Sequence, residues 1–128
     1  MSFRPIAACA ALLTVLWAGV VAAETRLVMF EEPGCVYCAQ WKAEVGDAYH
    51  LTAEGRAAPL MTIFMADPLP DGLTLERPVV YSPTFVLSID GAEVARLEGY
   101  PGEDFFWGLL GAMLTQNGVE WATGNADG

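Results

Sequence analysis

The chain has 128 residues, which is room for one domain. It carries 16 acidic and 6 basic side chains, and its formal net charge of −10 at pH 7 repels nucleic acid and anionic lipid. This charge excludes a protein that binds nucleic acid or an anionic membrane through its overall net charge. It leaves open whether the acidic surface serves a partner with a basic patch or only keeps the protein soluble.

Residues 1–23 have the organisation of a secretory signal peptide. Arg4 gives a short positive start, residues 6–20 are almost wholly apolar, and Val21, Ala22 and Ala23 are small residues of the kind that a signal peptidase reads. The alternative is an uncleaved membrane anchor, but the apolar stretch is shorter than the about 20 residues that usually span a bilayer. We therefore expect cleavage after Ala23, export to the periplasm and no membrane insertion of the mature chain.

Cleavage would leave Cys35 and Cys38 as the only thiols, because Cys9 lies in the apolar part of the signal. Outside the cytosol a free dithiol tends to become oxidised unless something supplies electrons. The pair is therefore expected to work as a redox couple, to hold a metal, or to form a structural disulfide.

Residues 26–30 are predicted to form the first strand. They are apolar with almost no alternation, which is typical of a strand covered on both faces. After Glu31 and Glu32, Pro33 cannot donate to a strand ladder and Gly34 permits a turn. The cysteines therefore begin a new element.

Residues 38–50 are predicted to form an amphipathic helix of about four turns, with Gly55 near its end. Its large apolar side chains recur three and four residues apart. Residues 59–65 form another continuous apolar run and predict a second buried strand. Two strands joined by one helix make a βαβ unit, whose strands should be parallel.

Residues 67–82 contain three prolines, which argue against a long helix and predict a connector with at most one short helical turn. The apolar segments 84–89 and 92–97 then flank Asp90 and Gly91, a pair that strongly predicts a tight antiparallel hairpin.

A last helix is predicted from Glu103 and Asp104, whose negative charges suit a helix N-terminus, to Asn117 and Gly118. Its expected apolar face consists of Phe106, Leu109, Leu110, Met113 and Leu114. We expect the folded domain to occupy residues 24–118 and residues 119–128 to form a flexible tail.

The order of elements and the position of the CxxC motif resemble the thioredoxin superfamily between residues 26 and 114. Cys35 and Cys38 follow a strand and begin a helix, and the step at Gly99 and Tyr100 precedes the closing helix. The segment Ser82-Pro83-Thr84 is similar to the family's cis-proline loop, which faces the dithiol. The resemblance implies an α/β fold: a βαβ unit followed by ββα, with a mixed central sheet flanked by helices.

Residues 33–38, residues 96–107 and the proline-rich connector are similar to the SoxS type, the exported thioredoxins of bacterial sulfur-oxidation systems. This resemblance implies a reductant that keeps the substrate-carrying cysteine of the Sox carrier complex free. Electrons would come from an integral membrane thiol transporter. We expect a monomer whose only redox group is the Cys35-Cys38 disulfide, with no other cofactor.

The two cysteines are expected to have different roles. The thiolate is the attacking species, and the N-terminal end of a helix stabilises an anion, which favours Cys35 as the nucleophile. Cys38 lies one turn further into the helix and should be more buried. It is expected to attack a mixed disulfide on Cys35, release the reduced partner and close the intramolecular disulfide.

The residues around the dithiol are expected to contact the substrate. Pro83, if its peptide bond is cis, would form the wall against which the partner's backbone lies, although it could simply be a stiff entry to a strand. Val36, Tyr37, Ser82 and Thr84 are the other expected substrate-binding residues, and Tyr37 could instead shield the dithiol.

Several residues depart from the thioredoxin pattern. The cytosolic members carry a buried acid on the first strand, six residues before the first cysteine, where this chain has Met29. Glu31 and Glu32 should oppose a thiolate on Cys35, and Lys42 is expected to be too far along the helix to compensate. Less thiolate stabilisation predicts a reducing couple, nearer thioredoxin than the oxidising periplasmic enzymes. The motif alone leaves an oxidase or disulfide isomerase open.

Two non-redox alternatives fit less well. A zinc or copper site would need two ligands besides the cysteines, and His50, the only histidine, lies near the far end of the helix. The methionines that could suggest a metal chaperone occupy core-like positions. A binding module with a structural disulfide is the remaining alternative, although a bridge across so short a loop constrains little of the unfolded chain.

Overall fold

The computed structural model of the protein describes residue 19 and residues 23–122. Apart from Gly19 and Ala23, the predicted signal peptide lies outside the described residues, as does the end of the predicted tail. Within the part that is described, no helix combines the length and apolar character needed to cross a bilayer.

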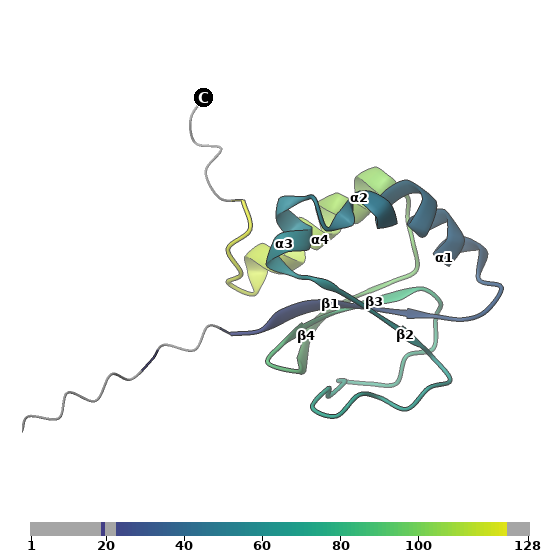
Figure 1. Ribbon diagram of the computed structural model, residues 1–128, viewed down its shortest axis with the longest axis horizontal. Coiled ribbons are helices and arrows are strands. Elements are labelled where there is room, and N and C mark those ends of the chain that lie inside the picture. Colours follow the sequence, from purple (N-terminus) through teal and green to yellow (C-terminus); the bar gives the residue numbers. More distant parts are fainter. Residues whose placement is uncertain (1–18, 20–22, 123–128) are drawn as a thin grey trace, which may run out of the picture.

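A four-stranded mixed sheet forms the centre of the molecule (Figure 1). The strands lie in the order β2-β1-β3-β4, with β1 parallel to β2 and antiparallel to β3, and β3 antiparallel to β4. This arrangement confirms the predicted parallel βαβ pair and the predicted hairpin. The strands span Thr25–Glu31 (β1), Leu60–Phe64 (β2), Thr84–Ile89 (β3) and Ala92–Glu98 (β4).

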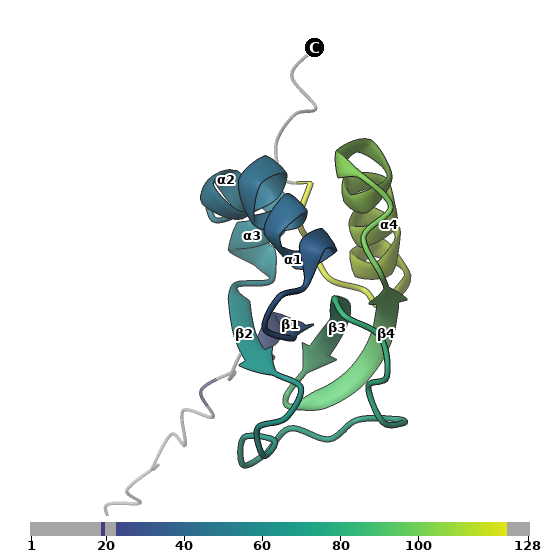
Figure 2. The same ribbon diagram turned by 90° about the vertical axis from the view of Figure 1, so that its right-hand side faces the viewer.

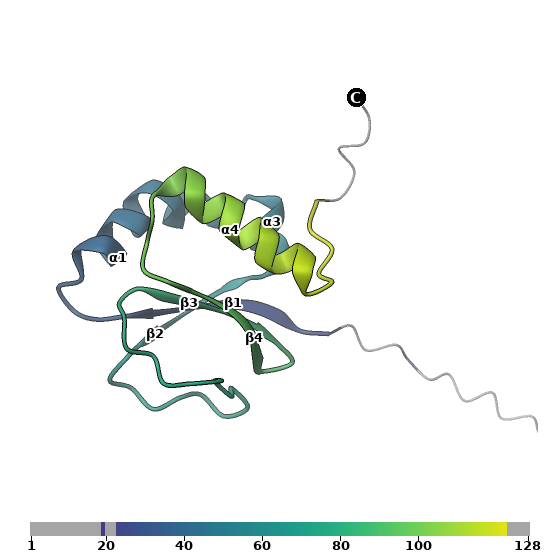
Figure 3. The same cartoon turned by 180° about the vertical axis from the view of Figure 1, so that it is seen from behind.

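All the helices lie on one side of this sheet, and the long connector between β2 and β3 runs along the other side (Figures 2 and 3). The connector contains no helix, so the helical turn allowed there by the sequence is absent from it. The helical segments span Val36–Trp41 (α1), Lys42–Gly46 (η1, a π-helix), Asp47–Tyr49 (α2), Ala53–Ala57 (α3) and Glu103–Gln116 (α4).

The main core lies between the sheet and the helices. Trp41, Phe85 and Phe106 are fully buried at its centre, with ring centroids 5.1–5.7 Å apart. These tilted and edge-on contacts add to the free energy gained from burying the rings. A smaller apolar cluster on the opposite face contains Val28 and Val86 and is covered by the connector.

The first helix differs from its prediction at both its middle and its end. It continues from α1 through a π-helical stretch to Tyr49 and then stops, so Gly55 lies in the separate helix α3 and not at the end of the first one. The side chain of Thr52 caps α3 by accepting a hydrogen bond from the amide of Gly55. A Cβ atom at position 55 would lie 1.8 Å from the carbonyl oxygen of Tyr49, so the turn between the helices requires glycine.

The second strand is less buried than its sequence predicted. β2 lies at the edge of the sheet, and only Ile63 of its five residues is buried, while Phe64 is exposed. A continuous apolar run does not distinguish a central strand from an edge strand, because both faces can be partly covered by loops. On α4, Leu109 is likewise exposed, although it was expected on the apolar face of the helix.

Charged side chains attach the connector to the sheet. Arg96 on β4 donates hydrogen bonds to the carbonyl oxygens of Arg77 and Pro78 and to Glu93, whose carboxylate accepts from the amide of Glu76. Glu93 and Arg96 are 3% and 4% exposed at their side chains. This buried ion pair therefore holds residues 76–78 of the connector against β4, a few residues before Ser82 and Pro83.

The described part of the tail contacts the domain. Trp121 donates from its indole nitrogen to the hydroxyl of Thr115 and packs against Gly111, where a Cβ atom would lie 2.9 Å from the indole ring. The chain is therefore attached to α4 as far as Trp121, beyond the expected start of the flexible tail at residue 119. Residues 123–128 of that predicted tail lie outside the described residues.

Candidate active site: a disulfide at a helix N-terminus

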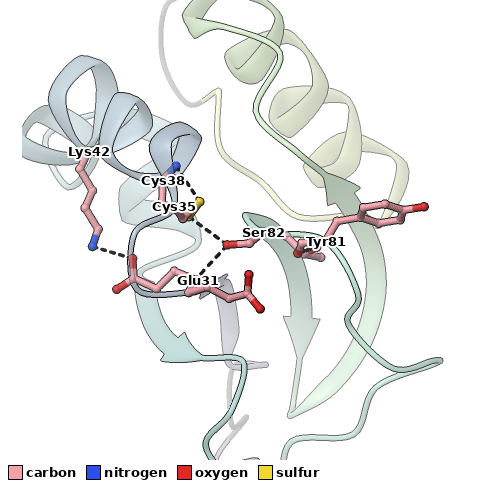
Figure 4. Close-up of a disulfide and its surroundings, with 8 residues drawn as sticks. Glu31, Cys35, Cys38, Lys42, Tyr81 and Ser82 are labelled. Carbon is pink, nitrogen blue, oxygen red and sulfur yellow. Dashed lines mark hydrogen bonds and ion pairs between the residues drawn. A yellow bond between two sulfur atoms is a disulfide. The ribbon is translucent and has the colours of Figure 1, made fainter.

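The end of β1 delivers the two cysteines to the start of α1. Cys35 is the N-cap residue of α1, and its sulfur accepts a hydrogen bond from the amide of Cys38 at 3.1 Å. The two residues form a disulfide with a Cα–Cα distance of 5.2 Å (Figure 4). The sequence correctly predicted that the cysteines begin a helix, because Pro33 and Gly34 end the strand just before them.

The two sulfur-bearing residues differ in exposure. Cys35 is half-buried, whereas Cys38 is 3% exposed and belongs to the main core. The expectation that Cys38 is the more buried of the pair is thus confirmed. An incoming thiolate or disulfide would meet Cys35 first.

The loop before β3 forms the other wall of the site. The peptide bond between Ser82 and Pro83 is cis, as the resemblance predicted. The hydroxyl oxygen of Ser82 lies 3.2 Å from the sulfur of Cys38 and accepts a hydrogen bond from the amide of Glu32 at 3.1 Å. Thr84 is fully buried and donates to the carbonyl oxygen of Tyr81, so its side chain supports the loop and lies away from the exposed surface.

Exposed apolar side chains adjoin the disulfide and the cis-proline loop along the chain. Val36 and Tyr37 are 74% and 59% exposed, so Tyr37 does not cover the dithiol. Val80 and Tyr81, which precede the cis-proline loop, are also exposed, and Figure 4 shows the ring of Tyr81 directed away from the sulfurs. Sequence reasoning missed Val80 and Tyr81, although their position directly before Ser82 was the available signal.

The charge near Cys35 differs from the prediction. Glu31, at the end of β1, is buried, and its carboxylate forms an ion pair with the ammonium of Lys42 at 2.5 Å (Figure 4). The expectation that Lys42 cannot compensate was wrong, because the flexible lysine side chain reaches from the helix to the end of the strand. Glu32 remains exposed and has no ion pair among the described residues.

Glu44 and Tyr100, near the first helix, share a hydrogen bond that shifts the pKa of both groups. The hydroxyl of Tyr100 donates to Glu44, and this bond, with a second from Gln40, lowers the pKa of Glu44. Burial and the neighbouring Glu44 raise the pKa of Tyr100. Met29, at the position of the family's acid, is fully buried in the main core.

The described residues contain no group of three or more His, Cys, Asp or Glu side chains arranged to hold a metal ion. His50 is exposed and follows α2, at the opposite end of the helical segment from Cys35.

The fold and the site define a class of protein. The sequence profile of the thioredoxin-like domain matches residues 21–114, and the chain belongs to this family. Among solved structures, it is similar to the reduced form of the periplasmic thioredoxin SoxS from Paracoccus pantotrophus. The two are 58% identical, the match covers 73% of this chain and 99% of that chain, and the TM-score is 0.72. The comparison with curated proteins gave no match.

These findings confirm the family, the resemblance to SoxS and the mixed α/β fold that the sequence predicted.

Proposed function

We propose that this protein is a periplasmic thiol–disulfide oxidoreductase that reduces a protein disulfide or mixed disulfide. The observation that carries the proposal is the arrangement of the cysteines: an accessible Cys35 is bonded to a buried Cys38 at a helix start, opposite the loop that contains Pro83. A purely structural bridge over so short a loop would contribute little to stability.

The reaction requires a dithiol and two exchange steps. In the reduced protein, the Cys35 thiolate attacks a sulfur of the partner's disulfide, forms a mixed disulfide and releases one partner sulfur as a thiolate. The Cys38 thiolate then attacks the sulfur of Cys35. The Cys35–Cys38 bond forms, the bond to the partner breaks, and the second partner sulfur leaves as a thiolate. The partner gains two electrons and this protein loses two.

The surface around the disulfide suits a protein substrate. Val36 and Tyr37 provide exposed apolar contacts beside Cys35, and Pro83 lies in the adjoining loop. A polypeptide docked there would bury Val36 and Tyr37, which favours association. Val36, Tyr37, Ser82 and Pro83 are the proposed substrate-binding residues.

The similarity to SoxS supports a specific partner. We infer that the substrate is the carrier subunit of a thiosulfate-oxidising system, held as a disulfide or mixed disulfide at its substrate-carrying cysteine. Because the periplasm oxidises free thiols, the protein would need electrons from a membrane thiol transporter. The predicted signal peptide and the relative's periplasmic origin support this location.

A trapping experiment tests the proposed function. In the mature chain, Cys38→Ser removes the resolving thiol, so the mixed disulfide on Cys35 should persist when the variant meets a periplasmic extract containing the carrier subunit. The adduct is separated without reductant and identified by mass spectrometry. Cys35→Ser is the matched control, because it keeps one thiol but removes the nucleophile.

The proposal predicts a reductant-sensitive adduct with Cys38→Ser and far less with Cys35→Ser. No adduct, together with no reduction of a model protein disulfide by the wild-type chain, would indicate a structural disulfide. Rapid oxidation of reduced, unfolded proteins without accompanying reductase activity would instead indicate an oxidase.

A further inference from the structure

The side chain of Ser82 has a fixed orientation beside the buried sulfur. Its oxygen accepts a hydrogen bond from the amide of Glu32 and lies 3.2 Å from the sulfur of Cys38 (Figure 4). A hydroxyl has one proton to donate and two lone pairs to accept with. Because a disulfide sulfur carries no hydrogen, the donor in the contact with Cys38 must be the hydroxyl of Ser82.

No other described side chain provides a hydrogen bond to this sulfur. The position of the family's acid is occupied by Met29, which has no titrating group. The nearby carboxylate of Glu31 is paired with Lys42, and Figure 4 shows that pair on the opposite side of the dithiol from Ser82. Among the described side chains, the hydrogen bond to the Cys38 sulfur therefore comes from Ser82.

We propose that Ser82 is a catalytic residue whose hydroxyl stabilises the thiolate of Cys38 each time the disulfide opens or closes. This inference rests on the proposed function and adds a role to the same site. The hydroxyl contacts one of the two reacting sulfurs, and the amide of Glu32 is the positioning group that keeps its proton directed at that sulfur.

The role can be followed through one exchange step. An incoming thiolate attacks the sulfur of Cys35, a new S–S bond forms there, and the Cys35–Cys38 bond breaks. The bonding electron pair leaves on Cys38 as a thiolate, which accepts the hydrogen bond from Ser82. A second thiol of the reductant, as its thiolate, then releases Cys35, so the reductant loses two electrons and the protein gains two. Hydrogen bonds to charged groups are stronger than neutral ones, so the contact strengthens as the charge develops.

Reduction by dithiothreitol tests this role without any protein partner. The rate of disulfide opening is measured for the oxidised mature chain and for Ser82→Ala, which removes the hydroxyl at a half-buried position. We expect the rate to fall about tenfold, the effect of losing one charge-assisted hydrogen bond in the transition state. Ser82→Thr, which keeps a hydroxyl, should restore most of the rate. Ser88→Ala, on the strand β3 that follows the Ser82 loop but away from the sulfurs, is the matched control and should leave the rate unchanged.

A rate for Ser82→Ala within twofold of wild type would overturn the proposal, as would an equal loss in Ser82→Ala and Ser82→Thr. Alkylation gives a second measurement. In a Cys35→Ser background Cys38 is the only thiol of the mature chain, and adding Ser82→Ala should slow its alkylation at neutral pH several-fold. Equal alkylation rates would contradict the role of the hydroxyl.

These outcomes separate this inference from the proposed function. If Cys38→Ser forms the trapped adduct and the wild-type protein is reduced by dithiothreitol, but Ser82→Ala is reduced at the wild-type rate, only the role of Ser82 fails. If Cys38→Ser traps no partner and the wild-type protein reduces no protein disulfide, the proposed function itself fails, whatever the effect at Ser82.

Discussion

At the scale of single residues, the site depends on the different surroundings of two chemically identical side chains. Cys35 caps a helix at the surface, and Cys38, one turn later, is enclosed by the core. The same side chain therefore gives an accessible sulfur at Cys35 and a protected one at Cys38, as the proposed exchange reaction requires. The charges around them come from Glu31, Glu32 and Lys42.

Removing Lys42 should expose the charge of Glu31 to the active-site sulfur. In Lys42→Met the carboxylate of Glu31 loses its ion pair and opposes the Cys35 thiolate by roughly 0.5 kcal/mol, the value for charges about 8 Å apart in water. Alkylation of reduced Cys35 by a neutral reagent should slow about twofold. The double variant Glu31→Gln/Lys42→Met is the control and should recover the wild-type rate.

Equal alkylation rates in the wild-type, single and double variants would show that this ion pair does not influence the nucleophile.

Residue identities alone revealed part of this site. The spacing of Cys35 and Cys38 and the sequence around Pro83 predicted the disulfide site and the loop opposite it. The ion pair between Glu31 and Lys42 was missed, because residue spacing along a helix does not show how far a flexible side chain reaches. The contact between Ser82 and Cys38 joins residues 44 positions apart, and its geometry depends on the fold.

At the scale of elements, the buried ion pair on β4 connects the sheet to the connector. Arg96→Met would leave the carboxylate of Glu93 buried without its counter-charge, which costs about 3–5 kcal/mol in other buried pairs. Urea unfolding should show a loss of that size. The double variant Glu93→Leu/Arg96→Met removes both charges and should lose less. A double variant less stable than the single would contradict this explanation.

The same pair predicts how stability depends on pH. Burial alone would raise the pKa of Glu93, but hydrogen bonds from Arg96 and from the amide of Glu76 outweigh it and lower the pKa. The folded state therefore binds this proton less tightly than the unfolded state. Its contribution is complete above about pH 4.3, the ordinary pKa of glutamate, and is lost as the pH falls through the lower folded value.

Unfolding in urea at a series of acidic pH values measures this contribution. Below about pH 4.3, the stability of the wild-type protein should fall more steeply than that of Glu93→Leu/Arg96→Met. Parallel pH dependence in the two proteins would show that Glu93 is not responsible.

The elements themselves were largely predictable from sequence. The hairpin at Asp90 and Gly91 and the last helix follow local rules of turns and caps, so their positions were correct. The π-helical stretch at Lys42–Gly46 and the turn before Gly55 were not predicted, since apolar spacing is similar in continuous and interrupted helices. The edge position of β2 was missed because it depends on strand order, which the run of residues 59–65 does not encode.

At the scale of the whole molecule, the sheet separates two different layers. The helices, with the disulfide at the start of α1, cover one face, and the connector covers the other before returning to the site at Ser82 (Figure 1). The basic side chains of the ion pairs are matched by acidic neighbours, so the excess negative charge remains on the surface. Such a surface would suit a partner with a basic patch, and it also keeps the protein soluble.

The reduction potential of the Cys35–Cys38 couple tests most directly whether this protein is a reductant. The mature chain is equilibrated in redox buffers of defined potential, and the fractions of dithiol and disulfide are counted by alkylation and mass spectrometry. We predict a potential near that of thioredoxin, about −270 mV. A potential above about −150 mV, close to that of the strongly oxidising periplasmic enzymes, would contradict the account and identify the protein as an oxidant.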